Sequence, residues 1–499
     1  MRGSTNLAKE ALPAPPGYLH PPVPPAPASP WLAGDHPSMP GNGTWPPPGS
    51  PWPPVREAAY DPWLEDWFKD PPAAAPDPPR GPGPARARAR VGWPWWLLWP
   101  WTAVWVAWQL ALKMTGQSWH FFAQGGQLLF GTGMGTGLQL YAAHPGLQIG
   151  PLALAASGVL RLTGPGQGEI AAVALMSATG PVVLWAVWRL LPPAERGKHS
   201  RLFLAGLFFL PVWTELTTHF AHLDDLLALC FSVAALHAVA RRNPVWAGLA
   251  LAAATDAKPW AAAFVALIFA LPRRQWLAAL SAFTGGVAAA WLPFLAADPH
   301  TLTAARFSIP NDPSSALRVL GVMSPRTPWW DRSAQLALGA AAGLLAVRRG
   351  RWPAVLLVAV AARILLDPGV YGYYTSGAVL GTIVVDLVLT RWRFPWATAA
   401  AATLLYAARM THQLVPFDLH QLGVLRLIFA IGVPVLVLGV PGWWITRRRG
   451  RHARAGDQVT IISPAQARHR DRNGSLQLNS DNEHITWHCG RAGNPAHRE

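Results

Sequence analysis

Long apolar runs alternate with short clusters of arginine between about residue 91 and residue 446. The clusters follow every second run, as at Arg241–Arg242 and Arg348–Arg349. In multi-pass membrane proteins, Lys and Arg are enriched in the loops that stay in the cytoplasm. A run of roughly 20 apolar residues crosses a bilayer as a helix. The pattern therefore predicts an all-α fold, a polytopic transmembrane helical bundle of about twelve spans.

Ten of the expected spans are single helices, and the stretch 245–271 is long enough for two short helices that meet near Asp256 and Lys258. Residues 115–168 hold no acid, and we expect them to form a large first outer loop with an interfacial helix along the outer surface. We place the ten single spans at residues 93–114, 170–190, 202–216, 226–240, 276–296, 334–347, 353–366, 376–389, 395–409 and 424–445.

The two ends of the chain differ in composition from its centre. Residues 1–90 are rich in Pro, Ala and Gly, which predicts a disordered tail because such a segment buries no core. Residues 447–499 are polar and basic, and we expect a second disordered tail. The domains are thus a Pro-rich tail (1–90), a transmembrane domain (91–446) and a basic tail (447–499). The arginine pattern places both tails in the cytoplasm of a multi-pass protein of the plasma (inner) membrane.

Composition and charge support a membrane protein over a nucleic-acid-binding one. Charged residues make up 13% of the chain, against about 25% in soluble domains. The net charge is +16, but the arginines lie between apolar runs and are not interleaved with aromatic residues on one face. We therefore expect a membrane-lipid environment and no nucleic-acid partner. The sequence shows no motif for a cofactor, and we predict none.

The strongest group of ionisable residues lies between two expected spans, in the segment ELTTHFAHLDDLLAL. A charge at membrane depth is costly, so such a group indicates a functional site. The alternative is a solvated polar turn. His and carboxylate side chains also suit Zn or Mn, but no second ligand pair at fixed spacing appears elsewhere, and we predict no metal site. The group consists of Glu215, His219, His222, Asp224 and Asp225.

Two further features suit a phosphorylated or sugar ligand. Lys258 precedes Pro259 at a helix break, where it is well placed to hold a phosphate; the alternative is a lysine that extends to the interface. Arg306 belongs to an outer loop whose arginines break the positive-inside trend, which anion binding would explain. The segment LLDPGVYGYYTSG combines a carboxylate with aromatic rings, as carbohydrate sites do; the alternative is an interfacial aromatic belt. Its residues are Asp367, Tyr371, Tyr373 and Tyr374.

With these residues in view, the segment HFAHLDDLLALCFSVAALHAVARRNPVWAGLALAAATDAKPWAAAFVAL resembles the core of the GT-C superfamily of polytopic glycosyltransferases. It is most similar to the actinobacterial glycosyltransferase family 87 (DUF2029) type, the polyprenol-phosphate-mannose-dependent mannosyltransferase-like proteins. That type has an H-x-D element, a cytoplasmic basic turn and a later Gly and Lys. The matching positions here are His222, Asp224, Arg241, Arg242, Gly248 and Lys258.

The resemblance implies a polyprenyl-phosphate sugar donor and transfer by direct displacement, with inversion, on the outer face. It also implies a catalytic Asp in the first outer loop, and the sequence departs there, since no acid lies between Lys113 and Glu169. The base is then Asp224 or Asp225, with His120 as the second choice and His144 also open. Alternatively, the chain has lost transfer activity.

Two functions follow as hypotheses. The first is a hexosyltransferase of the membrane that moves a hexose, mannose first, from polyprenyl phosphate to an envelope glycolipid or glycan. In it, Asp224, Asp225 and His120 are catalytic. The second is a catalytically inactive GT-C-like protein that binds polyprenyl phosphate or scaffolds envelope synthesis. The substrate-binding residues expected for the first are His219, His222, Lys258, Asp367, Tyr371, Tyr373, Tyr374 and Arg306.

Overall fold

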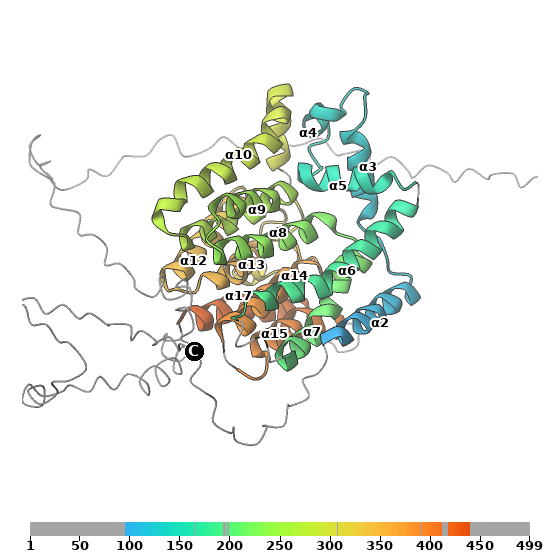
Figure 1. Ribbon diagram of the computed structural model, residues 1–499. Coiled ribbons are helices and arrows are strands. Elements are labelled where there is room, and N and C mark those ends of the chain that lie inside the picture. The colour runs from blue at the N-terminus through green and yellow to red at the C-terminus, as the bar shows by residue number, and fades with distance from the viewer. Residues whose placement is uncertain are drawn as a thin grey trace, which may run out of the picture. The chain divides into compact units, whose positions relative to one another are not determined.

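The computed structural model describes residues 95–164, 166–192, 196, 199–306, 308–390, 392–411 and 418–439 (Figure 1). The two predicted tails, 1–90 and 447–499, lie outside the described residues. The described part of the chain is helical, and its only backbone bridge of the β type joins Pro310 and Arg326. The structure thus confirms that the fold is helical, as the sequence predicted.

The longer helices are α2 (Leu98–Ala111), α3 (Trp119–Leu129), α5 (Pro151–Arg161), α6 (Gln167–Arg189), α7 (His199–Thr214), α8 (Leu223–Ala240), α9 (Pro244–Ala257), α10 (Arg273–Ala297), α12 (Asp331–Arg348), α13 (Val355–Leu366), α14 (Tyr374–Val384) and α17 (Leu419–Gly439). The short α-helices are α4 (Leu140–Ala143), α11 (Ala316–Val319), α15 (Trp396–Ala401) and α16 (Ala408–Thr411). The 3₁₀-helices are η2 (Trp95–Leu97), η3 (Gly137–Gln139), η6 (Pro259–Ala270), η7 (Pro299–Arg306) and η8 (Trp352–Ala354), and the π-helices are η5 (Glu215–His219), η9 (Val385–Leu389) and η10 (Ala402–Ala407).

Five helices in the described part of the chain are long and apolar enough to cross a membrane, by length and composition. They are α6, α7 continued by η5, α8, α10 and α17. Shorter apolar helices occur at α5, η6, η8–α13 and α14–η9. This result supports a membrane protein, while the twelve spans and the orientation of the termini stay predictions.

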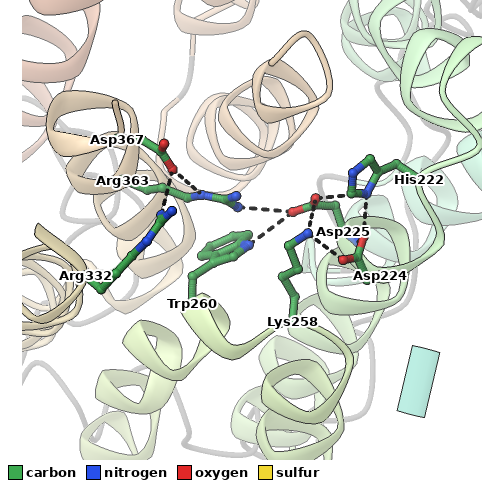
Figure 2. Close-up of polar contacts among 8 residues, drawn as sticks. All are labelled: His222, Asp224, Asp225, Lys258, Trp260, Arg332, Arg363 and Asp367. Atoms are coloured by element: carbon green, nitrogen blue, oxygen red, sulfur yellow. Dashed lines mark hydrogen bonds and ion pairs between the residues drawn. The ribbon is translucent and has the colours of Figure 1, made fainter. Parts of the chain in front are cut away.

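The chain breaks at Lys258, as the sequence predicts. Helix α9 ends at Ala257, and Lys258 takes an extended backbone conformation (φ −147°, ψ 111°). The residue before a proline is driven out of the helical region by the proline ring, and Pro259 follows. The next twelve residues form the 3₁₀-helix η6. The break directs the Lys258 side chain away from the axis of either helix and toward α8 (Figure 2).

Small residues bring the helices of this region close together. A Cβ added at Gly343 of α12 would lie 2.7 Å from Ala266 Cβ of η6, and one added at Gly339 would lie 3.0 Å from Ala263 Cβ. Glycines four residues apart on one helix face permit such an approach of two backbones in a membrane protein. Helix α12 thereby lies directly against η6, which fixes the position of the Lys258 break.

The connection from α7 to α8 is strained. The π-helix η5 continues α7 as far as His219, so the predicted turn begins only at Phe220. Ala221 is fully buried with φ 47°, a region that residues with a Cβ avoid. Strained backbone and π-helical turns are enriched at functional sites. Helix α8 starts two residues later, and its first turn holds Asp224 and Asp225.

The longer helices α3 and α5 lie in the stretch 115–168, where the sequence predicted a large first outer loop with an interfacial helix. Backbone hydrogen bonds join its start to the segment before α8: Gly116 N donates to Thr218 O (3.0 Å) and Ser118 N donates to Phe220 O (2.8 Å). Helix α5 has 11 residues, and at about 1.5 Å per residue it is too short for a bilayer. Its interfacial placement stays a prediction.

The basic ends of the helices lie opposite to their acidic ends. Helix α8 begins beside Asp224 and runs to Arg241, and α12 begins at Asp331 and runs to Arg348. At the basic end, Arg349 Nη1 donates to Leu438 O (2.5 Å), and Arg351 Nη1 donates to Val437 O. These arginines satisfy carbonyls in the last turn of α17, where a helix lacks partners for its C=O groups.

Candidate functional site

Asp224 is the centre of a buried polar cluster in the first turn of α8 (Figure 2). His222 Nδ1 lies 2.5 Å from Asp224 Oδ1, and Lys258 Nζ lies 2.5 Å from Asp224 Oδ2. The backbone N–H of Asp225 also donates to Asp224 Oδ1 (2.7 Å). Each oxygen of this carboxylate therefore has a partner, and Asp224 is held in one orientation.

Asp225 faces a different set of partners. Its Oδ1 accepts from Arg363 Nη1 and from Trp260 Nε1, each at 3.1 Å. Its Oδ2 lies 3.2 Å from Lys258 Nζ and 3.3 Å from His222 Nδ1 but accepts no hydrogen bond in the described part of the chain. Asp225 thus keeps one carboxylate oxygen for a further donor, whereas Asp224 does not.

Arg363 connects this cluster to the predicted carbohydrate segment. Its guanidinium carbon lies 4.4 Å from the ring centroid of Trp260 and 3.8 Å from that of Tyr374, both cation–π distances. Its Nε lies 3.5 Å from Asp367 Oδ2, which also lies 3.4 Å from Arg332 Nη1. Figure 2 shows the resulting row of charges, from Asp367 through Arg363 and Asp225 to Lys258.

The charges in this row balance. Three carboxylates (Asp224, Asp225 and Asp367) meet three permanent cations (Lys258, Arg363 and Arg332). All three carboxylates are at least 97% buried, and a buried charge is tolerated when it is paired. The row therefore has no cation left over for an incoming anion.

The three residues His222, Asp224 and Asp225 are also the group in the described residues whose side chains could hold a metal ion, since their ligand atoms lie within 4.8 Å of one another. Lys258 Nζ already contacts both carboxylates there. A bound cation would have to displace this ammonium, so the donor set fits a lysine counter-ion better than a metal.

A small cavity opens beside Asp225, and we call it the Asp225 cavity. Aromatic rings make up much of its wall. Such walls suit a sugar, whose C–H faces pack on rings while its hydroxyls bond to a carboxylate or guanidinium. The polar and aromatic lining residues are Asp225, Trp260, Arg363, Tyr373 and Tyr374.

The tyrosine segment is packed directly on the cluster. The ring of Tyr373 lies 3.7 Å from that of His222, centroid to centroid, and Tyr371 stacks on Tyr373 at 5.3 Å. Burial, and then the charge of Asp367, raise the pKa of Tyr371 above its usual value. The structure therefore brings together two sequence segments that were predicted separately, and it keeps Tyr371 a neutral hydroxyl donor.

Other predicted residues lie apart from this cluster. His120 is exposed on α3, and its ring packs on the neighbouring Phe121. His219 is buried and stacks on Phe220, and its Nδ1 has no hydrogen-bond partner in the described residues. Glu215 pairs with Arg409. Arg306 is the last residue of η7, and its side chain lies outside the described part of the structure.

Sequence reasoning missed two residues that the structure places at or beside the cluster. Trp260 donates to Asp225 and packs on Arg363. The chain contains 28 tryptophans, and nothing in the sequence distinguishes this one from the others. Arg426 lies within the apolar helix α17. An arginine inside a membrane span is itself a functional signal, and applying that rule to every span would have found it.

Known proteins support the same part of the chain. Residues 150–347 match the model of glycosyltransferase family 87. The matched stretch runs from the start of α5 into α12 and includes Asp224, Asp225 and Lys258, whereas Arg363 and Asp367 follow it. No curated protein and no solved structure matches the chain. Together with the apolar helices, the family match supports a GT-C-like membrane glycosyltransferase.

Proposed function

We propose that this protein is a hexosyltransferase that moves a hexose, mannose first, from a polyprenyl-phosphate carrier to an envelope glycolipid or glycan on the outer face of the plasma membrane. One observation carries the proposal. Within the stretch that matches glycosyltransferase family 87, Asp225 presents an oxygen without a hydrogen bond beside a cavity walled by aromatic rings.

Asp225 is the base in this proposal. An acceptor hydroxyl loses its proton to Asp225 Oδ2 as its oxygen attacks the anomeric carbon of the donor sugar. The bond between that carbon and the phosphate oxygen breaks at the same time, and the phosphate leaves with the electron pair. Attack from the side opposite to the leaving phosphate inverts the anomeric centre.

Asp224 and Lys258 position this base. Lys258 Nζ contacts Asp224 Oδ2 (2.5 Å) and Asp225 Oδ2 (3.2 Å), so it links the two carboxylates. Pairing with a cation favours the ionised form of a carboxylate, which is the form that accepts a proton. The same pairing makes Asp225 a weaker base. The reaction tolerates a weak base because the acceptor hydroxyl becomes strongly acidic as its oxygen bonds to carbon.

The sugar occupies the Asp225 cavity, with a face of its ring against Trp260 or Tyr373. Arg363 is held there by Asp225 and by its two aromatic neighbours, so it can donate to a sugar hydroxyl without a large loss of side-chain freedom. This arrangement separates the work of binding, done by the rings and Arg363, from the removal of the proton.

The test is a transfer assay with the full chain in lipid nanodiscs, labelled polyprenyl-phosphate mannose and an envelope glycolipid extract. We expect labelled glycolipid from the wild type and a rate about 10²–10⁴-fold lower from Asp225→Asn. Labelled donor that binds but is never consumed, across several sugar-lipid donors, would favour the inactive, lipid-binding alternative instead.

A further inference from the structure

A second small cavity lies next to the Asp225 cavity, and Tyr374 lines both. We call it the Arg426 cavity. Its wall combines loop residues before α11, the tyrosine segment and α17. The polar residues that line it are Ser315, Asp367, Tyr371, Tyr374, Thr375 and Arg426.

Arg426 is held in place but not neutralised. Its Nη1 donates to Ser314 O (2.6 Å), and within the described residues its guanidinium makes no other hydrogen bond and no ion pair. Asp312 acts on it electrostatically without an ion pair, and Asp312 Oδ1 already accepts from the N–H and hydroxyl of Ser314. An arginine stays protonated in proteins, so a net positive charge faces this cavity.

The backbone is shaped to deliver this side chain. A Cβ added at Gly423 of α17 would lie 3.0 Å from Ser315 O and 2.7 Å from Val319 Cγ2. Gly423 therefore lets α17 approach the α11 segment closely, and Arg426 follows one turn later on the same face. The contact with Ser314 depends on that approach.

Apart from Arg426 and Asp367, the polar side chains of the cavity carry hydroxyls, which can donate a hydrogen bond as well as accept one. The hydroxyls of Tyr371, Tyr374 and Thr375 make no hydrogen bond within the described part of the chain. Asp367 is the acid in the wall, and its oxygens are engaged by Arg332, Arg363 and the N–H of Gly369. A cation and three hydroxyls that are free to donate within the described residues suit a ligand that carries negative charge on several oxygens.

We propose that the Arg426 cavity binds a phosphate group, with Arg426 as its charged ligand and Thr375 and Tyr371 as hydroxyl donors. The choice of phosphate over other anions rests on the proposed function, but the binding itself requires no turnover. Lys258, which the sequence favoured for this role, is already paired with Asp224 and Asp225. The proposal thus assigns the anion to one cavity and the sugar to the adjoining one.

The test measures binding of labelled polyprenyl monophosphate, which carries no sugar, to the full chain in phosphatidylcholine nanodiscs. We expect Arg426→Gln to raise the dissociation constant about 10–100-fold, as the loss of a charge-assisted hydrogen-bond partner does. Arg426→Lys should cause a smaller loss and Thr375→Val a loss of a few fold. Arg274→Gln, which removes an exposed arginine at the start of α10, is the matched control and should bind as the wild type does.

Competitors identify the source of the phosphate. Competition by inorganic phosphate means that the phosphate group alone is recognised. If only unlabelled polyprenyl monophosphate competes, the polyprenyl part of the ligand is recognised as well. Neutral polyprenol that competes as well as the phosphate would overturn the proposal, as would wild-type binding by a folded Arg426→Gln protein. If that variant does not fold, unchanged binding by both Arg426→Lys and Thr375→Val would overturn it. Intact binding without sugar transfer would count against the proposed function and leave this site standing.

Discussion

Lys258 Nζ lies 2.5 Å from Asp224 Oδ2, although 34 positions of sequence separate the two residues. The contact exists because Pro259 ends α9 and because α8 packs along α9. Asp224 is fully buried, and its charge would be costly at this position without the Lys258 partner.

Lys258→Met should therefore destabilise the fold by about 3–5 kcal/mol, the usual cost of removing one partner from a buried ion pair. Adding Asp224→Asn should recover part of that loss, because the uncompensated charge disappears. Thermal unfolding of the two single variants and the double variant in one detergent measures this coupling. A Lys258→Met protein that melts with the wild type would contradict the importance of the pair.

Asp225→Asn should lower the turnover number about 10²–10⁴-fold, the usual contribution of a general base, with little change in the KM for the donor. The amide keeps the shape of the side chain but cannot take the proton. Asp298→Asn provides the control, since this half-buried acid bonds to His300 outside the cluster. Equal losses in the two variants would show that the effect of Asp225 is not specific to the site.

Transfer should be insensitive to EDTA. The side chains of His222, Asp224 and Asp225 are close enough to bind a divalent cation, but the Lys258 ammonium already contacts both carboxylates. Activity measured after dialysis against EDTA, with and without added Mn²⁺ or Zn²⁺, checks this. Loss on chelation and recovery with one of these metals would mean that Lys258 gives way to an ion.

Gly343→Leu should destabilise the protein by about 1–3 kcal/mol, the typical cost of overpacking. The new side chain would meet Ala266 of η6, since even a Cβ there lies 2.7 Å from Ala266 Cβ. Gly285→Ala in α10 is the control, because nothing lies within 4 Å of its Cβ and alanine suits a helix better than glycine. Thermal unfolding should show a decrease for the first variant and no decrease for the second.

Phosphate-lipid binding should persist from neutral pH to about pH 10, the usual pKa of tyrosine. The pKa of Tyr371 is raised by burial and by Asp367, so the folded protein keeps this hydroxyl protonated where an exposed tyrosine ionises. In the unfolded chain Tyr371 ionises first, so its contribution to stability declines as the pH rises above that value. Spectroscopic titration of the wild type against Tyr371→Phe reports the phenol directly. Ionisation of Tyr371 below its ordinary pKa would contradict the buried environment.

The sequence predicted the helices and the break at Lys258 well, because both depend on neighbouring residues. A helix follows from a run of apolar residues, and the break follows from a single proline. The contact of Asp224 with Lys258 follows from the packing of two consecutive helices, α8 and α9, in the structure. The contact of Asp225 with Arg363 did not follow, since 138 positions separate the two residues and helix packing decides which distant helix is adjacent.

Other misses have physical causes as well. His120 follows Trp119, which is buried, and a rotation of about 100° per residue carries His120 to the exposed face of α3. Glu215 and His219 were expected in a turn, but the pairing of Glu215 with Arg409 lets α7 continue as a π-helix through both residues. For Glu215 and His219, a contact outside the local sequence accompanies the departure from the expected turn.

The order in which the chain is synthesised gives the Asp225 contacts a further consequence. Trp260, Lys258 and Arg363 all follow Asp225 in the sequence, so α8 leaves the ribosome with two carboxylates whose cations have not yet been made. We expect α8 to wait at the insertion machinery until α9 and the Lys258 break emerge. Nascent chains stalled before residue 258 should then be extracted or degraded more readily than chains stalled after residue 272, and equal lifetimes would show that α8 inserts alone.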